Sequence, residues 1–306
     1  MKATRPPIYL LTMLLASPFI GTLARAATIT IQVITTFDYP GATHTYPSAI
    51  NDHNEITGFF ESPNRAITSG FTRTVDGQFS APIVDPGDTH NLTAALGINN
   101  SETVLGYFFG VDDYHGFFFS GGVYTQYDVP GSSGTVLQGI NNAGDFVGYY
   151  YTPINELKGF MNIGGTVTTI DIPGGSYVTP HQLNSANQVV GYYVDNASGF
   201  GYSFYTGLTG TLQYPISAPG STTTYLYGIN DRGWMVGKYY DHSRIGHGLL
   251  FIPPSQFVTF DYANSPVVTL TGINRKGFIC GYYADDSGVH GILARVRRTG
   301  GNSASE

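Results

Sequence analysis

Charged residues and cysteines are scarce in this sequence. Charged residues make up 11% of the 306 residues, well below the roughly one quarter of an ordinary globular protein. Cys280 is the only cysteine, so no intramolecular disulfide can form, and its apolar surroundings at 278–281 predict a small buried residue rather than a nucleophile. After residue 26, no apolar run reaches the ~20 residues of a membrane-spanning helix.

The sequence also lacks the common signatures of catalysis. It contains no G-x-S-x-G nucleophile elbow, no H-E-x-x-H metal motif and no G-x-x-x-x-G-K-[ST] phosphate loop. The sequence therefore predicts no catalytic residue, no metal site and no cofactor. A glycoside hydrolase needs two carboxylates that converge across a cleft, and a single sequence does not show convergence, so an enzymatic function stays open.

The first 26 residues have the pattern of a secretory signal peptide. Lys2 and Arg5 precede an apolar run at 8–16, and Ala24-Arg25-Ala26 fits a small-residue cleavage site. We expect cleavage after Ala26 and export to the extracellular space or the periplasm; an uncleaved membrane anchor is the alternative. Cleavage removes three basic residues and no acidic one, which changes the net charge from −7 to −10. Such an acidic chain argues against nucleic acid as a partner.

What the sequence does contain is a sixfold repeat. An Ile-Asn or Leu-Asn pair recurs with its asparagines 48, 42, 43, 46 and 44 residues apart. The pairs are Ile50-Asn51, Ile98-Asn99, Ile140-Asn141, Leu183-Asn184, Ile229-Asn230 and Ile273-Asn274. A period of this length is typical of an array of one supersecondary unit. Residues that recur in every copy are therefore expected to serve the architecture, and residues found in one copy are better candidates for function.

Each copy predicts four short strands joined by tight turns. In the third copy the strands are expected at 135–140, 145–150, 158–162 and 166–171, with turn residues between them. The second predicted strand carries a repeated glycine, usually followed by two aromatic residues. These glycines are Gly58, Gly106, Gly148, Gly191, Gly237 and Gly281.

The two ends of the array complement each other. The chain opens with a lone fourth-strand pattern at 35–38 and closes with a third strand at 290–296 that no fourth strand follows. We therefore predict an all-β, six-bladed β-propeller of four-stranded blades over residues 27–297, closed by the N-terminal strand, which completes the last blade. A right-angled solenoid or β-helix is the alternative. The signal peptide would cover 1–26, and a disordered tail 298–306.

The repeat resembles a known family of extracellular proteins. Gly-Ile-Asn-Asn at 97–100 and 139–142, Val-Gly-Tyr-Tyr at 147–150 and the His-Gly pairs at 115–116, 247–248 and 290–291 are similar to the motifs of the HAF family. Ser69, Lys158 and Phe200 replace that histidine in the other copies. The resemblance implies export and a repeat fold, and it brings no established activity and no catalytic residues.

Most repeated polar residues have a structural interpretation. The six asparagines are expected to bind their own turn backbone, and His115, His247 and His290 are expected to bind neighbouring backbone, because equivalent places in different blades do not converge on one metal. The aromatic pairs such as Tyr149-Tyr150 could stack on sugars, although packing between blades is the commoner role.

The candidate ligand site lies on a loop face. In a propeller the strand after each closing Pro-Gly lies innermost, and the fourth-to-first and second-to-third strand loops share one face. Residues on these loops that do not recur in all copies are our candidate ligand-binding residues. They are His44, Arg65, His90, Asp112, Asp113 and Tyr114. The alternative is that these are turn-forming residues and solvated loop charges.

Three functions are compatible with these sequence features. The first is a secreted, monomeric propeller that serves as a binding or adhesion module, with an unknown extracellular carbohydrate or protein as its ligand. The second is a hydrolase or lyase acting on a polysaccharide, and the third is a structural repeat protein of an extracellular matrix. Convergence of carboxylates would favour the enzyme, and retention of a ligand would favour the binding module.

Overall fold

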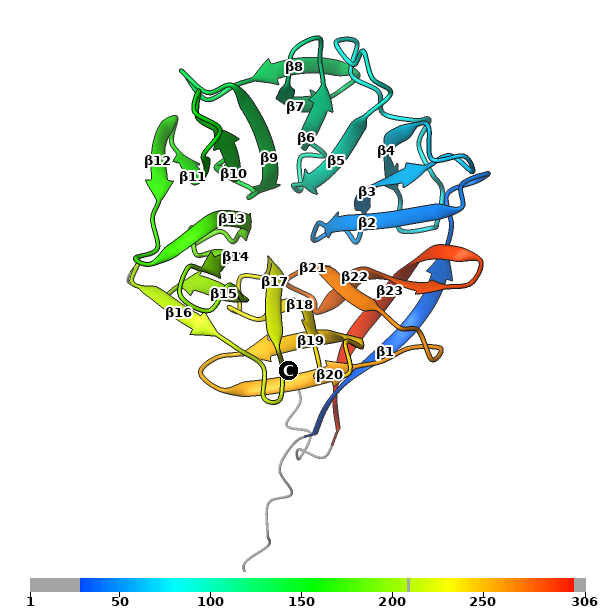
Figure 1. Cartoon of the computed structure of the whole chain (residues 1–306). Coiled ribbons are helices and arrows are strands. Elements are labelled where there is room, and N and C mark those ends of the chain that lie inside the picture. The colour runs from blue at the N-terminus through cyan, green and yellow to red at the C-terminus, as the bar shows by residue number, and fades with distance from the viewer. Residues whose placement is uncertain (1–27, 208–209, 300–306) are drawn as a thin grey trace, which may run out of the picture.

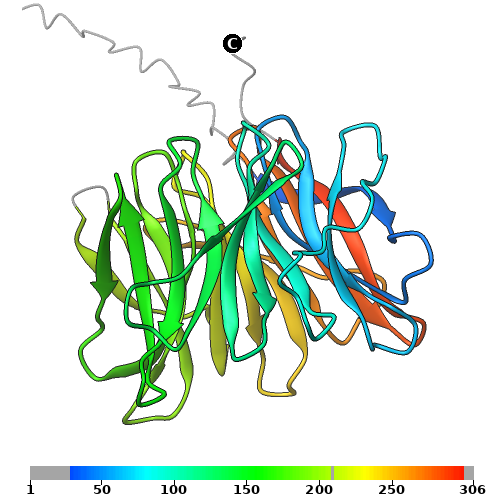
Figure 2. The same cartoon turned by 90° about the horizontal axis from the view of Figure 1, so that it is seen from above.

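The computed structural model describes residues 28–207 and 210–299, which form 23 strands. The sheets stand around a central axis, as Figure 1 shows along the axis and Figure 2 from above. The predicted signal peptide at 1–26 lies outside the described residues. So does the predicted tail at 298–306, except for residues 298–299, which belong to the last strand.

Four of the sheets are antiparallel blades of four strands each. The first contains β5 (Thr93–Ile98), β6 (Val104–Phe109), β7 (Tyr114–Ser120) and β8 (Val123–Tyr127). The second contains β9 (Gly134–Ile140), β10 (Phe146–Tyr151), β11 (Leu157–Ile163) and β12 (Thr166–Ile170). The third contains β13 (Gly175–Leu183), β14 (Val189–Asp195), β15 (Gly201–Thr206) and β16 (Leu212–Ile216). The fourth contains β17 (Thr223–Ile229), β18 (Met235–Tyr240), β19 (Gly246–Ile252) and β20 (Gln256–Phe260).

The prediction of six four-stranded blades was wrong. The remaining strands form one seven-stranded sheet in the order β21-β22-β23-β2-β3-β4, with β1 also paired to β23. Its strands are β1 (Thr28–Phe37), β2 (His44–Ile50), β3 (Ile56–Glu61), β4 (Thr68–Arg73), β21 (Val268–Ile273), β22 (Phe278–Asp285) and β23 (Gly288–Thr299). The observed architecture is a β-propeller with four four-stranded blades and this larger sheet, which joins the two ends of the chain.

Two local features account for this difference. The N–H of Val289 donates to the backbone oxygen of Thr43 at 3.2 Å, and a parallel bridge pairs His44 with Val289, so β2 and β23 belong to one sheet. The outer edge of β4 is met only by isolated bridges, one of them between Gly70 and Ile83. Pro82 cannot donate a ladder hydrogen bond, which interrupts a regular fourth strand there.

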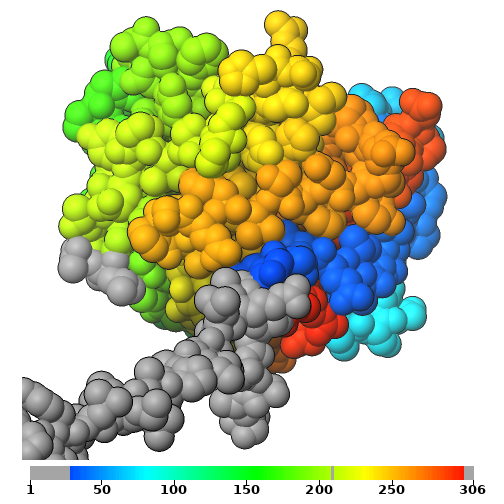
Figure 3. Space-filling view, turned by 90° about the horizontal axis from the view of Figure 1, so that it is seen from below, coloured from blue at the N-terminus to red at the C-terminus, as the bar shows by residue number. Residues whose placement is uncertain are grey.

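The N-terminal strand pairs with the C-terminal strand along its whole length. β1 runs antiparallel to β23, from Thr28 opposite Thr299 to Phe37 opposite Gly291, with one register shift after Val33. Figure 3 shows this dark blue segment lying against the orange and red C-terminal strands at the surface. Residues separated by most of the chain therefore close the ring through backbone hydrogen bonds.

The repeated second-strand glycine creates a bulge in each innermost strand. A Cβ atom added to Gly148 would lie 2.2 Å from the backbone oxygen of Val136, and the six equivalent distances run from 1.9 to 2.3 Å. Only glycine permits such an approach of two backbones. Opposite each glycine the register shifts by one residue in β2, β5, β9, β13, β17 and β21. A bulge turns the extra residue out of the ladder and re-aims its side chain.

The apolar core is divided into layers between neighbouring sheets. Val147 of β10, for example, packs with Val178, Val189 and Phe204 of the following blade, all of them buried. Each layer removes the facing sides of two sheets from water, which is the main favourable contribution to their association. The innermost strand of each repeat faces the axis, as the sequence predicts (Figure 1). These strands are β2, β5, β9, β13, β17 and β21.

Candidate functional site

The six repeated asparagines form a closed ring of hydrogen bonds at one end of the axis. Each side-chain oxygen accepts two N–H groups of its own turn; Asn230 accepts those of Arg232 at 3.0 Å and Trp234 at 3.1 Å. Each side-chain amide donates to the backbone oxygen of the asparagine in the next repeat, from Asn230 to Asn274 at 3.0 Å and from Asn274 to Asn51 at 2.9 Å. The predicted bonds to the turn backbone are confirmed, and the bonds between repeats are an addition.

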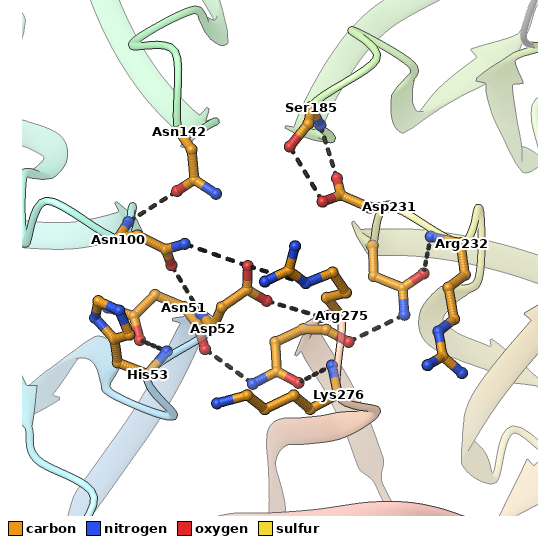
Figure 4. Close-up of polar contacts among 12 residues, drawn as sticks. Asn51, Asp52, His53, Asn100, Asn142, Ser185, Asp231, Arg232, Arg275 and Lys276 are labelled. Carbon is orange, nitrogen blue, oxygen red and sulfur yellow. Dashed lines mark hydrogen bonds and ion pairs between the residues drawn. The ribbon is translucent and has the colours of Figure 1, made fainter. Parts of the chain in front are cut away.

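A second set of polar bonds lies beside this ring. Residues that follow the asparagines bind across the turns: the N–H groups of Asp52, Asn100 and Arg275 donate to Asn100, Asn142 and Asp52, each at 2.9 Å. Figure 4 shows these side chains converging on the axis, around a hollow of about 60 Å³. Because these polar groups form hydrogen bonds with one another, the architecture explains why this end of the axis is polar.

A channel of about 170 Å³ lies farther along the axis. The six bulged residues line it, one from each inner strand: Ser48, Leu96, Gln138, His181, Tyr227 and Thr271. Tyr46, Phe59 and Tyr282 add aromatic walls. Among the described residues, no Asp, Glu, Lys or Arg lines this channel.

Two polar atoms of the channel lining, His181 Nε2 and Thr269 Oγ1, are shielded from solvent and have no hydrogen-bond partner among the described residues. The His181 ring stacks on Tyr192 with centroids 5.2 Å apart and meets Tyr227 edge-on at 4.9 Å. Burial lowers the pKa of His181 to about 3, so the ring is neutral at neutral pH. Burial, reinforced by nearby tyrosines, raises the pKa of Tyr227 well above its usual value.

A group of tyrosines lies on the face that carries the second-to-third and fourth-to-first strand loops. We call Tyr107, Tyr114, Tyr149, Tyr151, Tyr177 and Tyr192 the tyrosine cluster. Tyr107 meets Tyr114 edge-on at 5.5 Å, and Tyr149 meets Tyr151 at 5.9 Å. Burial, followed by the charges of Tyr114 and Tyr151, raises the pKa of Tyr107 to about 12. The cluster comes from β6, β7, β10, β13 and β14, so it spans three blades.

The structure places His44 and Arg65 together, apart from the tyrosine cluster. Arg65 Nη2 lies 2.6 Å from His44 Nε2. Both side chains also approach one carboxylate, because Glu61 Oε2 lies 3.7 Å from Arg65 Nε and 3.9 Å from His44 Nδ1. The same carboxylate and Tyr282 reinforce burial in raising the pKa of Tyr46 to about 12. These two candidate residues therefore stand beside a wall residue of the channel.

The other candidate residues lie in or next to the tyrosine cluster. The Phe109 ring meets His90 at 4.5 Å and Tyr114 at 4.8 Å, both edge-on, and so connects these two predicted residues. Asp113 accepts the N–H of Tyr114 at 2.8 Å. Asp112 instead points to His115, with Oδ1 3.2 Å from Nε2. The six predicted residues thus form two groups, and no hydrogen bond or ring contact among the described residues joins the groups directly.

The three repeated histidines bind carboxylates, where binding to backbone was expected. His290 Nδ1 lies 2.9 Å from Asp38 and its Nε2 lies 3.1 Å from Asp285. His115 and His247 each stand between two aspartates in the same way. Burial alone would lower the pKa of His290, but its hydrogen bonds to Asp38 and Asp285 outweigh burial and raise that pKa. These triads connect the third strand to the closing loop and are architectural.

A hollow of about 270 Å³ between the second and third blades was not predicted from the sequence. Here Lys158 replaces the repeated histidine and lies 3.2 Å from Glu156 instead of between two aspartates. Asp171 and Tyr177 also line the hollow. Tyr177 is 61% exposed and has a φ of 51°, which is unusual for a bulky residue and recurs at functional sites.

A positional signal could have found Tyr177. His44 and His90 each lie four residues after a closing proline, and Tyr177 holds the same position after Pro173. Burial raises the pKa of Tyr151, and the nearby Tyr114, Asp113 and Tyr177 raise it further, in that order. The hollow therefore adjoins the rest of the tyrosine cluster.

The described part of the chain offers neither a metal site nor a helix that could span a membrane. No group of three or more His, Cys, Asp or Glu side chains in residues 28–207 and 210–299 is arranged to hold a metal ion. The same residues contain no helix with the length and apolar character needed to cross a membrane.

Comparisons with known proteins identify the fold class. No family model matches the chain, and no curated protein sequence matches it. A mutant lectin from Aleuria aurantia, solved in complex with Fucalpha1-6GlcNAc, is similar in structure, with a TM-score of 0.51 and 10% identity over 86% of this chain and 98% of the lectin. TolB from Acinetobacter baumannii gives a TM-score of 0.53 and 9% identity over 79% of this chain and 65% of TolB. At such low identity the likeness concerns the fold alone. The chain is an all-β protein with the β-propeller fold.

Proposed function

We propose that this protein is a secreted carbohydrate-binding propeller whose glycan lies across the tyrosine cluster. One observation carries the proposal: six tyrosines from three blades lie near one another, and none of their hydroxyl groups donates to or accepts from a described residue. A tyrosine presents an apolar ring and a polar tip together. A sugar ring offers the complement, with C–H groups on its faces and hydroxyls on its edge.

The hollow beside the cluster adds polar partners for a glycan. Glu156 and Asp171 supply carboxylate oxygens, which accept hydrogen bonds, and Lys158 supplies three donors. The exposed ring of Tyr177 stands over this hollow, so a sugar stacked on Tyr177 has these groups within the same lining. A positive φ is costly for a bulky aromatic residue such as Tyr177, which further supports a functional role for it.

Two other considerations support the proposal. The Aleuria aurantia lectin, which shares the fold, was solved with a fucosylated disaccharide, so a propeller of this general type accommodates sugar binding. The proposed place of action, outside the cell, depends on the predicted signal peptide at 1–26 alone.

A glycan array with the full-length chain tests this proposal, followed by titration of the glycans retained. The informative variant is Tyr177→Gly. It removes the stacking ring, so we expect the affinity to fall about tenfold, which corresponds to about 1.4 kcal/mol. Glycine accepts a positive φ, so the free energy of unfolding should stay unchanged or rise by up to about 1 kcal/mol.

The matched control is Tyr214→Ala on the outer strand β16, at a tyrosine that is 38% exposed. This variant should bind the glycan as the wild type does. Retention of no glycan would contradict the proposed function, and a Tyr177→Gly variant with unchanged affinity would move the site away from the cluster. Product analysis of the retained glycans after long incubation distinguishes a binding module from a hydrolase or lyase.

A further inference from the structure

The axial channel has the features of a built site that the tyrosine cluster does not explain. Its wall includes the six bulged residues, and each bulge lies opposite a repeated glycine that permits the close approach of the two strands. A bulge re-aims one side chain per inner strand, so the fold directs six side chains into the channel. Their identities differ in every copy, unlike the asparagines and glycines that make the architecture.

The channel contains polar groups that lack partners. His181 Nε2 and Thr269 Oγ1 belong to the channel lining, are shielded from solvent and have no hydrogen-bond partner among the described residues. The Gln138 side chain and the Tyr227 hydroxyl also make no hydrogen bond to a described residue, but they are open to water in the channel. Polar groups in protein interiors are almost always hydrogen-bonded, to protein, water or ligand. Together these groups indicate an occupant with several hydroxyl or carbonyl groups.

The channel also restricts the charge and shape of that occupant. No charged side chain of the described residues lines it, and a charge placed there would be costly to desolvate without a partner. Tyr46, Phe59, Tyr227 and Tyr282 provide flat apolar walls. The volume of about 170 Å³ equals that of about five or six water molecules in the liquid, which suits a small ring.

We infer that the axial channel binds one uncharged sugar ring through Gln138, His181 and Tyr227, and so selects glycans that end in a neutral monosaccharide. This inference rests on the proposed function and adds specificity to it. Tyr192 provides the connection, because it belongs to the tyrosine cluster and its ring stacks on His181. A glycan that crosses the cluster could thus place its terminal ring in the channel.

Titration calorimetry of the full-length chain with simple glycosides tests the inference. The neutral probes are the methyl pyranosides of glucose, galactose, mannose and fucose, and the charged probes are methyl glucuronide and methyl glucosaminide. We expect at least one neutral glycoside to bind and both charged ones to bind at least tenfold more weakly. Equal affinity for neutral and charged probes, or no binding by any neutral probe, would overturn the inference and leave water as the occupant.

Three variants remove one polar group each and keep the shape of the wall: Gln138→Met, His181→Phe and Tyr227→Phe. Each should weaken the neutral glycoside about three- to tenfold, which is the effect of one lost hydrogen bond. Gln213→Met on the exposed face of β16 is the matched control and should not change the affinity. Unchanged affinity in all three channel variants would place the sugar elsewhere.

The outcomes separate this inference from the proposed function. Loss of neutral-glycoside binding in the channel variants with array binding retained through Tyr177 supports both. Array binding that depends on Tyr177 but not on the channel, and that accepts charged terminal sugars, refutes only the channel. A small neutral glycoside that binds in the channel while no larger glycan is retained refutes only the role of the tyrosine cluster.

Discussion

The asparagine ring makes a specific prediction about stability. Asn230 is 4% exposed and its side chain makes three hydrogen bonds: it accepts from the N–H groups of Arg232 and Trp234 and donates to the backbone oxygen of Asn274. Each such bond contributes about 1 kcal/mol net. Asn230→Ala should therefore lower the free energy of unfolding by about 3 kcal/mol, a large share of the roughly 5–15 kcal/mol typical of a domain.

Asn230→Asp separates the two bonds accepted from the turn from the one bond donated to Asn274. Aspartate keeps an oxygen for the two turn N–H groups, but its carboxylate faces the Asn274 carbonyl in place of a donor. The repulsion raises the pKa of the new aspartate in the folded state, so the penalty relative to wild type should be full at neutral pH. It should shrink as the pH falls through this raised pKa and be smallest below the unfolded pKa of about 3.9, where the protonated acid can donate.

Urea unfolding followed by circular dichroism measures both effects. Asn196→Ala is the matched control, since Asn196 is exposed and its side chain makes no hydrogen bond to a described residue. This control should change the free energy of unfolding by less than about 0.5 kcal/mol. An Asn230→Ala variant as stable as the control would refute the idea that the ring holds neighbouring sheets together.

The structure and the sequence support four further predictions. The raised pKa of His290 means that its triad contributes stability fully below the unfolded pKa of about 6.5, and this contribution should disappear as the pH rises through the folded pKa; a pH series of thermal melts should show the loss in wild type and not in His290→Asn. Deleting residues 27–38 removes the partner of β23 and should cause aggregation or a large fall in melting temperature; a monomer with unchanged melting would contradict ring closure. Gly148→Ala should destabilise by at least about 1–3 kcal/mol, because its Cβ would lie 2.2 Å from the Val136 oxygen, and a thermal melt matching the wild type would be incompatible with the close approach. Intact-mass analysis in the native host should find an N-terminus near Ala27, and a full-length cytosolic chain would contradict export.

Sequence periodicity predicted the features that depend on residues close together in the chain. The asparagines bind their own turns because an amide oxygen reaches N–H groups two and four residues later, which is a local geometry. The position of the inner strands and the pairing of the two chain ends also followed from the order of the repeats. The asparagine bonds between repeats depend on how the repeats are placed around the axis, which no single repeat encodes.

The number of separate blades and the details of the site could not be predicted in the same way. The N–H of Val289 donates to Thr43 and so joins β23 and β2 in one sheet. Pro82 interrupts the strand that would complete the first repeat. The repeated glycines were visible in the sequence, but the bulges opposite them, and hence the place of His181 in the channel lining, depend on the register between two strands. Tyr177 was predictable by analogy with His44 and His90, whereas its positive φ was not.

Glycan binding across the tyrosine cluster is the proposal on which the others depend. A crystal structure of the full chain with the tightest glycan from the array tests it most directly. We predict a sugar ring stacked on Tyr177 beside Glu156 and Lys158, with the terminal ring near His181. A glycan bound at the asparagine ring, or on the outer strands β8, β12, β16 or β20, would contradict the proposal.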